Sequence, residues 1–370
     1  MKSISYLPGL SFTHNFYINE IKDEFNYNVY STSPKSKFSI NKNGRYFFTP
    51  MPFKIISRLS RLSYSEFLKS SDLSIYNKLI SISLRKSDVY HCNSCFAHSA
   101  FKSKLSNNSL KIVEEQNSHI LYCNNTLRKE YLKYNLDFNK GENLIKKRLE
   151  EYELADIILV PSDYSVNTFI EMGVSKKKLF KNMLINSKYL NVEKKNKIKD
   201  QKIVFGYIGG NVVTKGLIYL LKSLIKNKYN YELHITLEKK YVQKFNYLKK
   251  YLNNNIKYLG NFSNMDNFYK NINILVVPSI NDGFGMVVIE ALSRSIPVIV
   301  SNKVGSSEFI NSEFGYTFEA TNQDQLDYLI NEKISKQNIY DLSNKIFNNF
   351  YKIKNVFKES SNKLLQLYNY

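Results

Sequence analysis

The chain has 370 residues, of which 43% are hydrophobic and 14% aromatic. That length accommodates two domains with a buried core each, and that composition excludes an intrinsically disordered chain. The formal net charge of +21 is able to attract phosphates, nucleic acid or an anionic membrane. Because lysine, asparagine, isoleucine and tyrosine are abundant everywhere, the position of the charge is more informative than its total.

Membrane spans and disulfide frameworks are also disfavoured. No apolar run approaches the roughly 18 residues that a spanning helix needs, and the N-terminal MKSISYLPGLSF has no signal-peptide pattern. We therefore expect a cytoplasmic protein. Cys92 and Cys95 form one C-x-x-C, and Cys123 stands alone. Because no second pair or spaced histidine cluster completes a zinc site, we expect reduced thiols.

The first half of the chain alternates apolar strands with amphipathic helices. Strands rich in isoleucine, valine and leucine, separated by helices, predict a parallel sheet covered on both faces. The expected strands are ISYLP (4–8), NVYSTS (28–33), SDVYHCNS (87–94), SLKIVEEQ (109–116) and ADIILVPS (155–162).

The second half repeats this plan, and the chain therefore predicts an α/β protein with two doubly wound Rossmann-like domains facing each other across a cleft. Ligands of such sheets bind beyond the carboxyl ends of the strands, so we expect the active site in the cleft. The expected strands are KIVFGYIGG (202–210), YELHITL (231–237), NIKYLGN (255–261), INILVVPS (272–279) and IPVIVSN (296–302).

Composition also suggests the boundaries between these units. Residues 186–202 are polar and lysine-rich, which is typical of a linker. We therefore expect an N-terminal domain over 1–185 and a C-terminal domain over 203–340. Residues 341–370 have helical spacing, and we expect them to pack back across the domain junction.

Two acidic residues stand out in PSINDGFGMVVIEALSRSIPVIV (278–300). Asp282 lies in a Gly-Phe loop and Glu290 on an expected helix. Eight helical residues span about 12 Å, longer than the roughly 5–9.5 Å between paired glycosidase carboxylates. That separation suits the two ends of an extended ligand, with the ribose at Glu290 and a diphosphate near Gly283–Gly285 at a helix N-terminus. Taken alone, Asp282 also fits an N-cap and Glu290 an exposed helix residue.

A second motif strengthens the ligand-binding interpretation. FGYIGGNVVTKGLIYLLKSL (205–224) places a strand, a Gly-Gly turn and Lys215-Gly216 before another helix. A lysine at that position reaches a phosphate as a point charge, and the glycines let the backbone approach it.

Together these residues resemble the retaining glycosyltransferases of the two-Rossmann-domain (GT-B) type, family 4. The family has a Gly-turn-Lys-Gly element where this chain has 209–216, and an acid, Gly-Phe-Gly and a glutamate where it has 282–290. The resemblance extends over nearly the whole chain. Further matching segments are ADIILVPSDYSVNTFIEMGVSKKKL (155–179), ALSRSIPVIVSNKVGSSEFI (291–310) and GYTFEA (315–320).

The resemblance implies transfer of a sugar from a nucleotide diphosphate sugar to an acceptor hydroxyl, with retention of configuration. It implies that Glu290 binds the donor ribose and Lys215 the donor diphosphate, with Lys215 and Asp282 also catalytic. The C-terminal domain would hold the donor and the N-terminal domain the acceptor. The remaining donor-side positions are Gly209, Asn211, Gly283, Phe284 and Gly285.

Three residues of the N-terminal domain are further candidates. His119 follows an expected strand at the cleft end, and the resemblance implies contact with the donor sugar or leaving group. The alternative for His119 is a histidine satisfied within a loop. Gly9 and His14 lie on the first strand-helix turn, where acceptor contacts are expected.

The chain departs from the family pattern at two positions. Asp282 stands where glutamate is usual, and Gly210 where arginine is usual. A charge-assisted hydrogen bond contributes about 1.5–3 kcal/mol, so the missing arginine predicts weaker phosphate stabilisation unless Asn211 or a linker lysine compensates. The chain has no Asp-x-Asp. We therefore expect no metal cofactor, with Lys215 and helix N-termini stabilising the diphosphate.

A basic segment suggests where such an enzyme works. Residues 34–62 carry seven lysines and arginines, no acid, and interspersed aromatic and aliphatic residues. That composition predicts a helix on an anionic membrane surface, with the protein peripheral on the cytoplasmic face and its acceptor in surface polysaccharide or glycolipid synthesis. The alternative is an ordinary amphipathic helix packed on the first domain.

Two other functions fit parts of the sequence. An enzyme of the same fold that epimerises or hydrolyses nucleotide sugars would use a similar donor site. A nucleic-acid-binding protein would suit the charge of +21. It would also need a basic stripe with stacking aromatics and a recognisable module, which the sequence lacks, so we expect no nucleic-acid partner.

Overall fold

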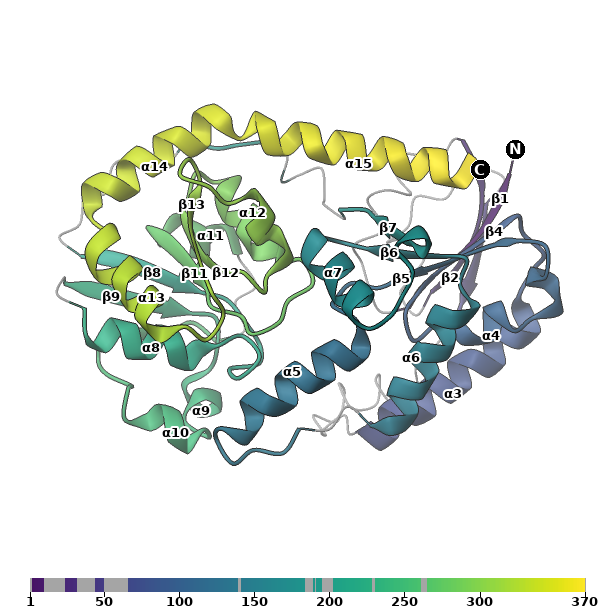
Figure 1. The fold of residues 1–370 in the computed structure, drawn as a ribbon, viewed down its shortest axis with the longest axis horizontal. Helices are drawn as coiled ribbons and strands as arrows, with labels where there is room; N and C mark the ends of the chain where they lie inside the picture. Colours follow the sequence, from purple (N-terminus) through teal and green to yellow (C-terminus); the bar gives the residue numbers. More distant parts are fainter. Residues whose placement is uncertain are drawn as a thin grey trace.

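The computed structural model describes residues 2–9, 24–31, 44–49, 66–138, 141–183, 189, 191–194, 202–227, 230–260 and 265–369. Two β-sheets, each flanked by helices, lie next to each other along the long axis of the molecule (Figure 1). Every described strand pair is parallel. The predicted fold class, two doubly wound Rossmann-like domains, is confirmed.

The first sheet contains the strands up to residue 181, in the order β3-β2-β1-β4-β5-β6-β7. Its strands are β1 (Ser3–Gly9), β2 (Asn26–Ser31), β3 (Arg45–Phe48), β4 (Val89–Asn93), β5 (Leu110–Glu114), β6 (Ile157–Val160) and β7 (Leu179–Lys181). The helices packed with them are α3 (Glu66–Ser83), α4 (His98–Phe101), α5 (Ile120–Leu132), α6 (Glu142–Leu154) and α7 (Asp163–Glu171).

The second sheet has the order β10-β9-β8-β11-β12-β13. Its strands are β8 (Ile203–Tyr207), β9 (Tyr231–Ile235), β10 (Ile256–Tyr258), β11 (Ile274–Val277), β12 (Val298–Ser301) and β13 (Gly315–Phe318). The helices are α8 (Leu217–Ile225), α9 (Lys239–Val242), α10 (Asn246–Lys249), α11 (Met265–Lys270), α12 (Met286–Leu292), α13 (Gln323–Tyr328), α14 (Lys336–Asn349) and α15 (Tyr351–Asn369).

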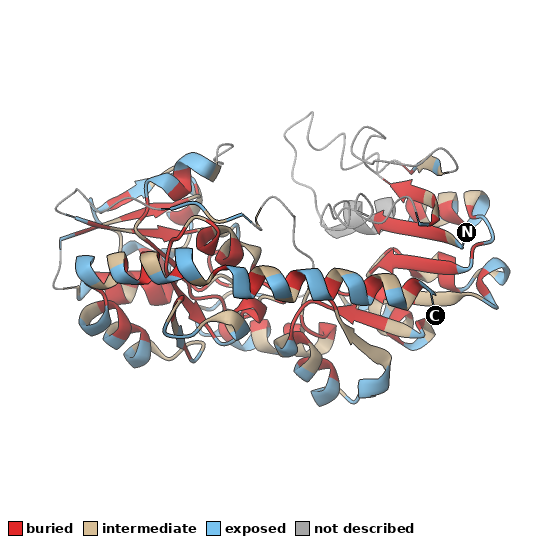
Figure 2. Ribbon diagram, turned by 90° about the horizontal axis from the view of Figure 1, so that it is seen from above, coloured by how far each residue is buried: buried red, intermediate tan, exposed pale blue. Residues whose placement is uncertain are grey.

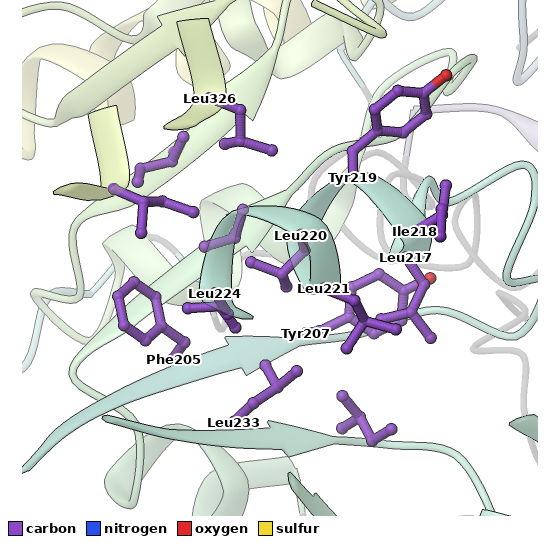
Figure 3. Packing of buried hydrophobic residues seen from close by; sticks show 14 of the residues in the cluster. Phe205, Tyr207, Leu217, Ile218, Tyr219, Leu220, Leu221, Leu224, Leu233 and Leu326 are labelled. Atoms are coloured by element: carbon purple, nitrogen blue, oxygen red, sulfur yellow. The ribbon is translucent and has the colours of Figure 1, made fainter. Parts of the chain in front are cut away.

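The apolar runs form central strands because helices cover both faces of each sheet. All residues of β4, β11 and β12 are buried. On one face of the second sheet, Leu220 and Leu224 of α8 pack with Phe205 and Leu233 (Figure 3). Burying one such side chain contributes about 1.5–3 kcal/mol, so this helix is fixed firmly above the sheet.

The C-terminal helix α15 connects the two domains (Figures 1 and 2). Ile353 and Phe357 belong to the core of the second domain, whereas Leu364 and Tyr368 belong to that of the first. The Tyr368 hydroxyl is hydrogen-bonded to Nδ1 of the buried His91. One helix therefore has its two ends in two different cores.

Parts of the sequence predictions fall outside the described residues. Of the basic segment 34–62, the structure describes 44–49, and of the expected linker 186–202 it describes 189, 191–194 and 202. Within the described ranges, no helix is both long enough and apolar enough to cross a bilayer. The cysteines, all of which lie in described ranges, are free thiols.

Candidate functional site

A pocket of about 300 Å³ opens where strands of both sheets end. From the first domain it is lined by Gln116 and Pro161, which follow β5 and β6. From the second domain come residues after β8 and β11, including five of the predicted site residues. These five are Gly209, Lys215, Asp282, Phe284 and Gly285.

The turn between β8 and α8 places Lys215 in this pocket. Asn211 holds the turn, because its side-chain oxygen accepts hydrogen bonds from the amides of Val213 (3.1 Å) and Thr214 (2.9 Å). Gly216 has a φ of +65°, and a Cβ on it would lie 1.9 Å from the carbonyl oxygen of Pro278. A glycine is therefore required where the turn passes the neighbouring strand.

Lys215 and Asp282 form an ion pair at the pocket. Their side chains are 29% and 18% exposed, so the pair is only partly shielded from water. Asp282 is fixed by its backbone amide, which donates to the carbonyl of Lys303 at 2.9 Å. Asp282 consequently compensates the lysine charge, and an anionic ligand would compete with Asp282 for it.

Two glycines shape the loop that follows Asp282. Gly285 has a φ of +77° at the start of α12, where a Cβ would lie 2.3 Å from Val304. Gly283 lies against the other domain, because a Cβ on it would be 2.3 Å from Cα of Asn117. The Gly283 carbonyl accepts from Ser162 Oγ at 2.7 Å. The two domains therefore touch at Gly283, next to the pocket.

Glu290 is on α12, one turn beyond Met286, which lines the pocket. Its Oε2 accepts a hydrogen bond from the hydroxyl of Tyr269 at 2.9 Å. The guanidinium of Arg294 donates to the Glu290 carbonyl at 2.8 Å and lies 4.7 Å from the centre of the Tyr269 ring. The carboxylate is thus held on one side, and Glu290 is not among the described residues that line the pocket.

His119 lies at the start of the helix that follows β5. It is the N-cap of α5 and only 2% exposed, and its Nδ1 accepts from the amide of Leu121. Its ring packs on Tyr152 and Phe169, with centroid distances of 5.2 and 4.9 Å. Burial lowers the pKa of His119 to about 4. Among the residues described as lining the pocket, His119 does not appear, although its near neighbour Gln116 does.

The remaining predicted positions lie further from the pocket or outside the described residues. Gly9 ends β1 at the carboxyl edge of the first sheet, where it pairs with Ser31. His14 lies outside the described residues. Within the described ranges, no three His, Cys, Asp or Glu side chains gather as metal ligands.

Sequence reasoning missed Asn281, which is 1% exposed and immediately precedes Asp282. Its Oδ1 accepts from Ser118 Oγ at 2.7 Å and from the Tyr164 hydroxyl at 2.5 Å. Its Nδ2 donates to Asn117 Oδ1 at 2.9 Å. The Asp282 loop is therefore anchored to the first domain. No local pattern reveals this role, because every one of these partners comes from the other half of the chain.

Comparison with known families and proteins matches the C-terminal half of the chain to a family of glycosyltransferases. Residues 190–352 match the family described as glycosyl transferases group 1, which confirms that this part of the chain resembles a glycosyltransferase. The chain is 30% identical over 158 residues to the capsular polysaccharide biosynthesis glycosyltransferase CapM of Staphylococcus aureus, covering 40% of this chain and 42% of CapM. It is 31% identical over 238 residues to protein CapJ of the same organism, covering 52% and 60%. The chain thus spans about half the length of these curated relatives.

Solved structures extend the likeness over the whole fold. Sucrose-phosphate synthase from Thermosynechococcus elongatus has a TM-score of 0.71 at 15% identity, covering 100% of this chain and 98% of that one. HepE from Anabaena, in complex with UDP and glucose, has a TM-score of 0.66 at 13% identity, covering 99% and 100%. At these identities the likeness establishes the two-domain fold.

Proposed function

We propose that the protein is a glycosyltransferase that moves a sugar from a nucleoside diphosphate sugar to an acceptor hydroxyl, with retention of configuration. The observation that carries the proposal is the meeting of Lys215 and Asp282 at a pocket built from the carboxyl ends of both sheets. The group 1 match over 190–352 supports it, because that range contains both residues. The UDP and glucose bound by HepE support a nucleotide-sugar donor.

In this proposal each side of the pocket has its own task. The Lys215 ammonium stabilises the charge that develops on the leaving diphosphate, together with backbone amides at Phe284 and Gly285. Glu290 accepts the ribose hydroxyls with the carboxylate that Tyr269 orients. Asp282 exchanges its bond to Lys215 for a contact with the donor sugar. The leaving phosphate itself then takes the acceptor proton on the same face.

The acceptor is proposed to be a surface polysaccharide or glycolipid. CapM carries capsular polysaccharide biosynthesis in its name, which supports this class. The basic segment 34–62 supports work at the cytoplasmic face of an anionic membrane, since each cation near such a surface contributes about 1 kcal/mol. Co-sedimentation with liposomes should increase with anionic lipid content and weaken in Arg58→Glu plus Arg61→Glu. Liposome binding that changed with neither the lipid charge nor these substitutions would contradict work at the membrane and favour a soluble acceptor.

A thermal-shift panel of nucleotide sugars, followed by product analysis, tests the function. A ligand at a hundredfold excess over its Kd stabilises the protein by about 2.7 kcal/mol, which is readily detected. The proposal predicts a shift with a subset of nucleoside diphosphate sugars and a new glycosidic product with an acceptor. Epimerised or only hydrolysed sugar would contradict transfer.

We also propose that the reaction needs no metal, because Lys215 and the helix-end amides supply the positive charge. Transfer should therefore continue in EDTA. Loss of activity on chelation, with recovery on adding magnesium, would contradict this part of the proposal.

A further inference from the structure

Helix α5 belongs to the first domain by sequence, yet most of its apolar stripe lies in the core of the second. Cys123 and Leu127 are buried in the same cluster as α8, β8 and β9, and Tyr131 packs against that cluster. These three residues are spaced by four, so they share one face of the helix. Ile120, at the first turn, is instead buried in the core of the first domain. Figure 1 shows α5 extending from the first domain towards α9 and α10.

A buried carboxylate fixes the far end of α5. Glu130 is 2% exposed, and its Oε1 accepts from the Tyr219 hydroxyl at 2.8 Å and the Tyr134 hydroxyl at 3.2 Å. Tyr219 lies on α8, and its hydroxyl points away from the packed leucines in Figure 3. Tyr134 stacks on Tyr247 of α10 with ring centroids 4.1 Å apart. Oε2 of Glu130 also pairs with Nζ of Lys133 at 2.7 Å, so the buried charge is compensated. The contacts that tie this end of α5 to the second domain are therefore the Tyr219 hydrogen bond and the stacking on Tyr247.

The same helix face reaches the turn that carries Lys215. The Tyr131 hydroxyl accepts a hydrogen bond of 2.7 Å from Nδ2 of Asn211. The other side-chain atom of Asn211, Oδ1, holds the amides of Val213 and Thr214. With Nδ2 bound to Tyr131, Oδ1 is directed into the turn. A first-domain tyrosine therefore contacts the second-domain side chain that holds the turn before Lys215.

We propose that α5 is a strut shared by both domains and that Tyr131, acting through Asn211, is a positioning residue for the turn that presents Lys215. The strut rests on packing alone, whereas its consequence for ligand binding rests on the proposed function. The domains would then move apart only if α5, as well as α15, left one of the two cores, so the pocket is held in shape before a donor arrives.

The test of positioning is Tyr131→Phe, which removes the hydroxyl and keeps the ring. Hydrogen exchange at the amides of Val213 and Thr214 should become several-fold faster. In calorimetric titrations with UDP, Kd should rise roughly two- to tenfold, the range for one lost hydrogen bond. The effect should vanish in an Asn211→Ala background, because the two residues act in series. Tyr328→Phe, at a 52% exposed tyrosine on α13, is the matched control.

The two readouts separate the inference from the function on which it partly rests. If the wild type binds UDP and Tyr131→Phe changes neither exchange nor Kd, the positioning role is wrong and the proposed function stands. If the wild type does not bind UDP, the exchange rates of the turn still decide the positioning role, and unchanged rates overturn it.

A second variant tests the strut itself. Leu127→Ala removes a first-domain side chain from the shared cluster and should speed hydrogen exchange in α8 of the second domain. Leu149→Ala, on α6 and packed against the first-domain core, should leave α8 unchanged. If the amides of α8 exchanged at the same rate in both variants, the inference of a shared core would be wrong.

Discussion

Lys215 and Asp282 are separated by 67 residues in the sequence and form an ion pair at the pocket between the domains. The pair keeps the lysine in place, but under the proposed function it would also compete with an incoming diphosphate. Asp282→Asn should free the Lys215 charge and remove a negative neighbour of the phosphates. We therefore expect UDP to bind several-fold more tightly in calorimetry, while sugar transfer slows. The pair Lys226–Asp327, which lies outside the pocket and whose aspartate is about as exposed as Asp282, offers the control Asp327→Asn. Weaker UDP binding in Asp282→Asn would contradict the competition.

The Tyr269–Glu290 contact predicts a graded loss of donor recognition. In the proposed function the Glu290 carboxylate accepts two ribose hydroxyls. We expect Glu290→Gln to lower kcat/KM by a factor equivalent to about 1.5–3 kcal/mol. Tyr269→Phe removes the orienting hydrogen bond, together with a longer one of 3.5 Å to the Val287 carbonyl, and should raise the donor KM to a smaller extent. Steady-state kinetics of both single variants and the double variant measure the coupling. Fully additive losses would show that Tyr269 does not act through Glu290.

The glycines of the first turn differ in what they permit. A Cβ on Gly210 would meet nothing within 4 Å, so Gly210→Arg should fold and supply the cation that the family pattern has there. A charge-assisted hydrogen bond contributes about 1.5–3 kcal/mol, and UDP affinity should rise accordingly. Gly216→Ala should instead destabilise the fold by about 1–3 kcal/mol, because φ is positive and Pro278 is in contact. Thermal unfolding measures the stability of the two variants, and titration with UDP measures their affinity. If Gly210→Arg folded and bound UDP with unaltered affinity, the diphosphate would not bind next to this turn.

The burial of His119 predicts a pH dependence of stability. Its pKa falls from 6.5 to about 4 in the folded protein, so folding favours the neutral ring. Stability from this residue is complete above pH 6.5 and is lost as the pH falls towards 4, by up to about 3 kcal/mol. His119→Asn keeps a good N-cap on α5 but removes the buried imidazole ring. The variant should therefore be less stable at neutral pH, and its stability should depend less on pH. Urea unfolding between pH 4 and 7 measures the free energy of unfolding at each pH. If it changed equally with pH in the wild type and in His119→Asn, His119 would not be the source of the pH dependence.

The same variant separates the two interpretations of His119. If the residue contacts the donor, His119→Asn should weaken UDP-sugar binding beyond its effect on stability. If it only caps α5, binding at pH 7 should be nearly unchanged once the protein is folded.

The fold was predictable because its central strands are local apolar runs buried on both faces. The short edge strands β3, β7 and β13 were not expected as strands, since three or four residues carry little periodic signal. The glycine turn and the Asp282 loop could be singled out from the sequence because both contain glycines that the local backbone requires. Both elements line one pocket because each follows the carboxyl end of a strand, and these strands, β8 and β11, are parallel neighbours.

The contacts between the domains were not predictable from local patterns. Asn281, Tyr131 and Glu130 have ordinary sequence surroundings, and their partners lie on elements far along the chain. The stripe of α5 predicts an apolar face but not which domain covers it. Long-range polar partners become visible only when the two sheets are placed next to each other.

The most direct test of the central claim, that the pocket at Lys215 binds the diphosphate of a nucleotide donor, is calorimetric titration of UDP into wild type, Lys215→Ala and Lys240→Ala. Lys240 is an exposed lysine on α9, outside the pocket. We predict measurable UDP binding in the wild type and the Lys240 variant, and a roughly tenfold to thousandfold loss in Lys215→Ala. Equal UDP affinity in all three folded proteins would contradict the claim.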